Sequence, residues 1–143
     1  MKKICFFTGS RSEYHLSKNL IKKFSNSKNF KTQLIVSGSH LSKRFGNTIA
    51  DILADKIKPS ILIKTNEKFN STQDISSALS LILKKSSLYL RKDRPDLMIL
   101  VGDRYETFCI SLACLIMNIP IAHIHGGEVT EGSYDDNFRH ALT

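Results

Sequence analysis

The chain has 143 residues, enough for one domain with a buried core, and its 41% apolar content is ordinary for a globular protein. No apolar run is long enough to span a bilayer, and the first one is too short for a signal peptide, so we expect a cytoplasmic protein without a membrane partner. The net charge of +8 comes from scattered lysines without a basic arm, which argues against nucleic acid and favours a solvated surface or an anionic small ligand.

The three cysteines, Cys5, Cys109 and Cys114, all fall within apolar segments. An odd number of cysteines without CxxC spacing argues against both a disulfide framework and a zinc site. We therefore expect these thiols to pack in the core as small apolar side chains.

A strand, a turn and a helix open the chain. Residues 4–8 predict a buried strand, and residues 9–14 (GSRSEY) predict the turn that starts the helix. Apolar residues at helical spacing define the inner face of that helix: Leu16, Leu20, Ile21 and Phe24. Free N–H groups at the helix start favour a phosphate, and Arg11 adds a guanidinium fork. The GxGxxG and GxxxxGK[ST] patterns are absent, so no standard dinucleotide or ATP site is predicted.

Strands and helices continue to alternate. Residues 32–37 predict the second strand and residues 61–63 a brief third strand. Between them, residues 48–57 predict a short helix with three apolar side chains turned inward: Ile49, Ile52 and Leu53.

A longer helix follows and ends near Leu90. Asn70, Ser71 and Thr72 are good N-cap residues, and Asp74 suits the first helical turn. Its apolar stripe is formed by Ile75, Ala78, Leu79, Ile82, Leu83 and Tyr89.

The most informative stretch is residues 97–136. It predicts a strand at residues 97–101, a buried helix at residues 108–117 and a strand at residues 119–124. Because such a unit is right-handed and parallel, the polar turns after both strands lie at the edge where open α/β sheets bind ligands. The whole pattern predicts an α/β fold with a doubly wound, mostly parallel sheet. Residues 136–143 begin another helix, so we expect a fragment of a longer protein.

The turns after the strands gather charged and imidazole side chains at one sheet edge. These are Arg11, His40, Asp103, Arg104, His125, Glu128, Asp135 and Asp136. Cations together with carboxylates and a histidine suit a phosphate-bearing substrate and proton transfer.

Each of these features also has a structural interpretation. Asp103 is a good cap for the next helix, and Arg104 can pair with Asp103 or another carboxylate. Gly126-Gly127 supplies either backbone freedom or close approach to a ligand. His123 and His125 point the same way from one strand, but no third ligand has telling spacing, so we favour a packed His123 over a metal pair.

Four segments in this order resemble the hydrolysing UDP-N-acetylglucosamine 2-epimerases of sialic-acid and legionaminic-acid biosynthesis: TGSRSEY, SGSHLSKRFGNT, GDRYE and NIPIAHIHGGEVTEGSYDDNFRHAL. The resemblance implies that residues 1–143 form the Rossmann-like N-terminal domain of a GT-B type two-domain enzyme. It implies that UDP-N-acetylglucosamine or a relative loses UDP and its C2 proton to give a glycal. Water then adds and releases N-acetylmannosamine, without a metal or redox cofactor.

The resemblance also implies residue roles. Substrate-binding residues are Arg11, His15 and Arg104, and catalytic residues are Asp103, His125, Glu128 and Asp135. A well-studied branch has glutamate at the position of His125, so the acid–base role falls to either His125 or Glu128.

The second, nucleotide-reading domain is missing from these residues, so we expect little or no activity from the chain alone. Two alternatives remain open, a non-hydrolysing nucleotide-sugar 2-epimerase and a non-catalytic nucleotide-sugar-binding or assembly module. The choice of UDP or GDP, the identity of the amino sugar and a homo-oligomeric state are also open.

Overall fold

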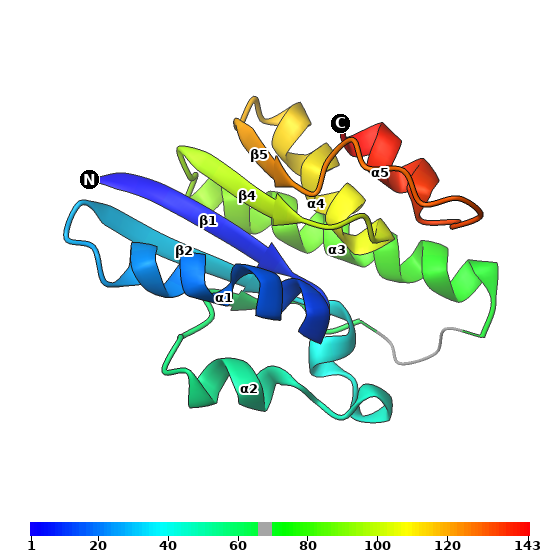
Figure 1. Ribbon diagram of the computed structural model, residues 1–143, viewed down its shortest axis with the longest axis horizontal. Helices are drawn as coiled ribbons and strands as arrows, with labels where there is room; N and C mark the ends of the chain where they lie inside the picture. The colour runs from blue at the N-terminus through cyan, green and yellow to red at the C-terminus, as the bar shows by residue number, and fades with distance from the viewer. Residues whose placement is uncertain (66–69) are drawn as a thin grey trace.

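The computed structural model describes residues 1–65 and 70–143 and has a parallel sheet at its centre (Figure 1). Its five strands lie in the order β3-β2-β1-β4-β5, and every neighbouring pair is parallel. The strands are β1 (Lys2–Thr8), β2 (Phe30–Val36), β3 (Ile61–Leu62), β4 (Leu97–Val101) and β5 (Ile121–Ile124). The predicted α/β fold with a parallel sheet is confirmed.

Helices cover both faces of the sheet, as doubly wound folds require. They are α1 (Arg11–Ser25), α2 (Ile49–Ala54), α3 (Thr72–Lys92), α4 (Tyr105–Ile116) and α5 (Asp136–Leu142). In Figure 1, α1 lies in front of the sheet and α3 lies behind it. Short 3₁₀ turns at Gly38–Leu41 and Lys43–Phe45 link β2 to α2.

Alternate residues of β1 enter two separate hydrophobic cores. Ile4 and Phe6 pack on the face covered by α1 and α2, whereas Cys5 and Phe7 pack on the face covered by α3 and α4. Because both faces are buried, β4 consists wholly of apolar residues, and so does the central part of β1, residues 4–7. All three cysteines are buried and free, as predicted.

Two side chains predicted to point inward are exposed, Leu16 by 61% and Leu53 by 56%. The buried face of α1 is centred on Tyr14, Ser17 and Ile21, and Leu16 lies on the far side of the helix from them. The helix α2 is only six residues long and buries Ile52 alone, so its neighbour Leu53 turns away from the core.

The turns after β1 and β2 touch at the carboxyl edge of the sheet. Ser39 donates its N–H to the carbonyl oxygen of Gly9 at 2.8 Å. Gly38 has a φ of +61°, and a Cβ atom there would lie 2.5 Å from the same carbonyl oxygen. Only glycine allows this close approach, which draws the two turns together.

The observed starts of α3 and α4 can be compared with the predicted ones. The helix α3 begins after Ser71, which is the N-cap among the three candidates predicted, and its side chain accepts from the N–H of Asp74. The helix α4 begins at Tyr105, three residues before its predicted start at Phe108. Within residues 1–65 and 70–143, no helix is both long and apolar enough to cross a membrane.

Candidate functional site

The turns after β1, β2 and β4 surround a cavity of about 390 Å³ at the carboxyl edge of the sheet. Its lining is rich in hydroxyl and charged groups: Ser10, Arg11, Ser12, Ser39, Phe45, Thr48, Arg104, Tyr105 and Glu106. Arg11 and Arg104 were both predicted site residues, and the structure brings them to one cavity. They meet there because β1 and β4 are adjacent parallel strands.

Arg11 is the first residue of α1 and keeps most of its side chain in solvent. Its Nε atom lies 3.2 Å from Oδ2 of Asp51 on α2, and the side chain is 65% exposed. The N-cap of the same helix is Ser10, so the positive end of the α1 dipole lies beside this guanidinium. An anion in the cavity can therefore meet both.

Arg104 is held from two sides. Its Nε lies 3.1 Å from Oε2 of Glu106 and its Nη2 lies 3.3 Å from Oε1. The guanidinium carbon lies 5.5 Å from the ring centre of Tyr105. Burial lowers the pKa of Arg104, but the charge and hydrogen bonds of Glu106, together with the nearby Glu13 and Tyr105, outweigh it, so the net pKa is above its ordinary range. Arg104 therefore pairs with a carboxylate as predicted, and the partner is Glu106.

Two buried carboxylates lie at this cavity, Glu106 in its lining and Glu13 close to it, and neither was among the predicted site residues. Glu13 accepts from the N–H groups of Gly9 at 2.6 Å and Ser10 at 3.0 Å. Burial, helped by the nearby Glu106, raises the pKa of Glu13 to about 7 despite the opposing hydrogen bonds from Gly9 and Ser10. The spacing Ser10-x-x-Glu13 is a capping-box signal that could have indicated Glu13, whereas no local pattern indicates Glu106.

Asp103 follows β4 and forms an ion pair with Arg139 of α5. Arg139 is buried and also donates from Nη1 to the carbonyl oxygen of Glu128 at 3.0 Å and to Oγ1 of Thr130 at 3.1 Å. It thus connects the turn after β4 to the loop after β5. The alternative in which Asp103 caps α4 is wrong, because the N-cap is Arg104.

His125 and Glu128 lie together in the loop after β5. Nδ1 of His125 is 2.9 Å from Oε1 of Glu128, and both side chains are substantially exposed. This hydrogen bond lowers the pKa of Glu128. His125 adopts a φ of +63°, which turns its side chain out of the strand direction.

Like Asp103, His125 and Glu128, the predicted site residues His15 and Asp135 do not line the cavity. His15 is exposed on the second turn of α1, where its ring makes an edge contact with Tyr14 at 6.1 Å. Asp135 lines a neighbouring cavity of about 330 Å³ between α3, α4 and α5. Tyr105 lines both cavities and is the wall between them.

Two further histidines at the sheet edge have structural roles. His40 is fully buried between the hydroxyls of Thr8 at 2.9 Å and Thr48 at 2.8 Å, and burial lowers its pKa to about 4. His123 donates from Nε2 to the carbonyl oxygen of Gly102 at 2.6 Å, which confirms the predicted packed histidine. In the described part of the chain, no three His, Cys, Asp or Glu side chains are grouped to hold a metal ion.

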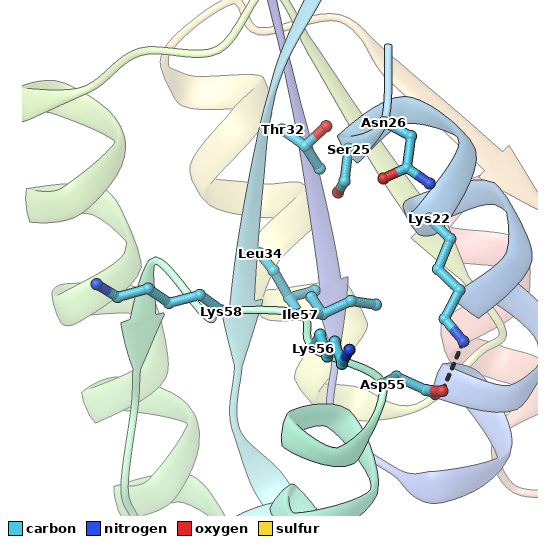
Figure 2. A pocket seen from close by; sticks show the side chains of 9 residues that line it. All are labelled: Lys22, Ser25, Asn26, Thr32, Leu34, Asp55, Lys56, Ile57 and Lys58. Atoms are coloured by element: carbon cyan, nitrogen blue, oxygen red, sulfur yellow. Dashed lines mark hydrogen bonds and ion pairs between the residues drawn. The ribbon is translucent and has the colours of Figure 1, made fainter.

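A cavity of about 470 Å³ lies elsewhere, beside the ends of α1 and α2 (Figure 2). It contains Lys22, Lys56 and Lys58, but the cations do not converge. Figure 2 shows Lys22 pointing to Asp55, with which it pairs at 2.5 Å, and Lys58 pointing away across β2. The cavity at the carboxyl edge is therefore the better candidate.

Residues 22–143 match the sequence profile of the family described as UDP-N-acetylglucosamine 2-epimerase. This chain belongs to that family. It is 36% identical over 145 residues to the GDP/UDP-N,N'-diacetylbacillosamine 2-epimerase (hydrolyzing) of Campylobacter jejuni. It is 34% identical to polysialic acid biosynthesis protein P7 of Escherichia coli and 30% identical to the UDP-N,N'-diacetylbacillosamine 2-epimerase (hydrolyzing) of Legionella pneumophila.

This epimerase-family chain is aligned almost completely in each comparison, over 99%, 100% and 100% of its length. It spans only 37%, 37% and 38% of the three relatives. The matching part of each relative is therefore little more than a third of that protein.

Solved structures share the fold. The UDP-GlcNAc 2-epimerase of Neisseria meningitidis bound to UDP-GlcNAc aligns with a TM-score of 0.78 and 21% identity, over 100% of this chain and 39% of that one. The S. aureus MnaA–UDP co-structure aligns with a TM-score of 0.80 and 22% identity, over 99% and 36% of the two chains. The epimerase-family chain thus has the fold of an N-terminal domain from these enzymes.

Proposed function

We propose that this chain is the Rossmann-like N-terminal domain of a hydrolysing nucleotide-sugar 2-epimerase of GT-B type. Its substrate is UDP-N-acetylglucosamine or a relative such as a 4-acetamido-6-deoxy amino sugar, in sialic-acid or legionaminic-acid biosynthesis. One observation carries the proposal. Arg11 and Arg104 line a single cavity at the carboxyl edge of the sheet, in a chain that belongs to the epimerase family.

The cavity suits the diphosphate of such a substrate. Arg11 presents an exposed guanidinium, Arg104 presents a second one, and Ser10 and Ser12 line the same cavity. Guanidinium forks bind phosphate oxygens in pairs, and a helix N-terminus adds positive potential. The same charges stabilise the diphosphate as it leaves C1.

The acid–base groups that we assign do not line this cavity: Asp103 directly precedes the cavity-lining Arg104, and Asp135 lines the neighbouring cavity across Tyr105. A carboxylate removes the C2 proton, the C1–O bond breaks, and its electron pair leaves with UDP, which gives a C1=C2 glycal. Water then adds at C1, and a proton returns to the opposite face of C2. We assign these proton transfers to Asp103, held by Arg139, together with His125, Glu128 and Asp135.

The pairing of His125 with Glu128 supports a shared role for these two residues. The two groups lie 2.9 Å apart, so a proton taken by one can pass to the other. His15 is the weaker assignment among the substrate-binding residues, because it lies one helical turn beyond the cavity.

A second candidate function is nucleotide-sugar binding without turnover. One observation favours it: Asp135 lies in a different cavity from Arg11 and Arg104 and is separated from them by Tyr105. A catalytic site requires these groups to act on one substrate.

The test is a chimera in which residues 1–143 replace the matching segment of the Campylobacter jejuni relative. We expect UDP release from UDP-N,N'-diacetylbacillosamine, and we expect Asp103→Asn to reduce it by at least about 100-fold while the circular dichroism spectrum is unchanged. Asp96→Asn is the matched control, because Asp96 lies at the opposite end of β4 and pairs with Lys2. A folded chimera that binds UDP without releasing product would favour the binding module instead.

A further inference from the structure

Glu106 is buried beneath the turns that form the cavity. Its side chain is only 3% exposed, although the residue follows directly after the cavity-lining Tyr105. A Cβ atom on Gly38 would lie 3.0 Å from Oε1 of Glu106, and one on Gly9 would lie 3.6 Å from its Cβ. The backbone of two turns thus closes over this carboxylate and leaves it little room to move.

A buried carboxylate is costly unless a cation pairs with it. Arg104 supplies that cation through two contacts, at 3.1 Å from Nε and 3.3 Å from Nη2. A guanidinium has five N–H donors. The side-on contact with Glu106 engages the Nε donor and one donor of Nη2. It does not use the end-on edge, which presents one donor of Nη1 and one of Nη2.

The Tyr105 ring restrains the same guanidinium on its face, at 5.5 Å from ring centre to the guanidinium carbon. One edge and one face of Arg104 are therefore occupied by protein. The remaining edge, formed by Nη1 and Nη2, is the geometry that matches a pair of phosphate oxygens.

We propose that Glu106 is a positioning residue that fixes the Arg104 guanidinium so that its end-on edge receives the diphosphate of the ligand. This inference rests on the proposed function and names a residue that acts through Arg104 without touching the ligand. It also explains why an acidic side chain lines a cavity proposed for an anion.

The proposal and simple electrostatics predict opposite results for Glu106→Gln. Removing a negative charge beside an anion site should tighten anion binding if charge alone matters. If Glu106 positions Arg104, the substitution loses one of two acceptor contacts and introduces an amide donor against a guanidinium, so binding weakens. The sign of the change distinguishes the two.

The experiment is a calorimetric titration of the 143-residue chain with UDP at constant ionic strength. We expect Glu106→Gln to weaken binding by about tenfold, Glu106→Asp to restore part of the loss, and Arg104→Ala to weaken binding at least as much. In the double variant Arg104→Ala/Glu106→Gln the losses should not add, because both act through one guanidinium.

Thr107→Val is the structural control. Thr107 is buried beside Glu106 and donates to Oε1 of Glu13, so its loss perturbs the same region without touching Arg104. We expect UDP affinity close to that of the unmodified chain.

Three results would overturn the proposal. They are equal or tighter UDP binding by Glu106→Gln, additive losses in the double variant, and an equal loss in Thr107→Val. If UDP binds and Arg104→Ala weakens it while Glu106→Gln does not, positioning fails and the nucleotide-sugar function stands. Absence of UDP binding to the unmodified chain would overturn the positioning role, whereas the proposed function is tested separately by UDP release from the chimera.

Discussion

Glu13, in the first turn of α1, and His40, in the turn after β2, are both buried at the carboxyl edge of the sheet, and their pKa values are displaced in opposite senses. Burial favours the neutral form of each group. Glu13 therefore has its pKa raised to about 7, and His40 has its pKa lowered to about 4. Glu13 is neutral with its proton bound, whereas His40 is neutral with its second proton lost. The two groups consequently give opposite slopes to a profile of stability against pH.

Glu13→Gln should reveal the contribution of Glu13. Between the ordinary carboxyl pKa of 4.5 and the folded value of about 7, the folded state keeps a proton that the unfolded state has lost. The free energy of unfolding contributed by Glu13 is therefore present below pH 4.5 and is lost as the pH rises through 7. The charged groups that act on this carboxyl are Glu106, which raises its pKa, and Arg104, which lowers it; burial is the largest cause of the shift.

The measurement is urea unfolding of both proteins from pH 4.5 to 7.5. The stability of the unmodified chain minus that of Glu13→Gln should fall across this range by on the order of 1–3 kcal/mol. The contribution of His40, which rises with pH between about 4 and 6.5, is common to both proteins and cancels in the difference. A difference that stays constant with pH would show that Glu13 titrates as an ordinary carboxyl.

At the scale of elements, the cavity depends on turns that only glycine can form. Gly38 and Gly46 both have positive φ, +61° and +83°, but their surroundings differ. A Cβ atom on Gly38 would lie 2.5 Å from the carbonyl oxygen of Gly9, whereas one on Gly46 would meet nothing within 4 Å. An alanine at Gly46 would add backbone strain alone, whereas an alanine at Gly38 would add both strain and a steric clash.

Gly38→Ala should destabilise the fold by roughly 2–4 kcal/mol, because strain and a clash with backbone act together. Gly46→Ala should cost only about 1 kcal/mol, from strain alone. Urea unfolding of the two variants measures both costs. If the two variants lost the same free energy of unfolding, the turns after β1 and β2 could move apart without destabilising the fold.

Local signals predicted the elements better than they predicted the packing of single side chains. The N-cap Ser71 and its partner Asp74 fixed the start of α3, and five consecutive apolar residues fixed β4 at its observed bounds. Leu16 and Leu53 were assigned to the core from helical spacing, but a helix packed on a sheet buries one narrow face, and its position depends on tertiary contacts.

In the candidate site, too, local sequence signals predicted some residues, whereas residues that depend on tertiary contacts were missed. Arg11 and Arg104 could be placed together because parallel β-α-β units bring all strand ends to one edge. Arg139 was missed because it binds Asp103 from 36 positions further along the chain, and periodicity carries no information about such a pair. Glu106 was missed because its burial results from turns after β1 and β2, far from it in sequence.

At the scale of the whole molecule, the proposed site is open. The side chain of Arg11 is 65% exposed, and those of His125 and Glu128 are 43% and 58% exposed. In the proposed reaction, the enzyme must hold the glycal and the leaving diphosphate in a fixed relative position. Water must enter only for the second step, the hydration of the glycal. Exposed groups do not exclude water or restrict the substrate to one geometry.

The isolated 143-residue chain should therefore bind UDP but turn over little or no UDP-N-acetylglucosamine. It spans 37% of the Campylobacter jejuni relative, and we propose that the rest of such a protein supplies the opposite wall of the cleft. Incubation with UDP-N-acetylglucosamine, followed by chromatography for N-acetylmannosamine and UDP, gives the rate. The chimera described above, assayed in parallel with the same sugar nucleotide and with UDP-N,N'-diacetylbacillosamine, is the comparison. Rapid N-acetylmannosamine release by the isolated chain would show that one wall suffices, and the two-domain proposal would then be wrong.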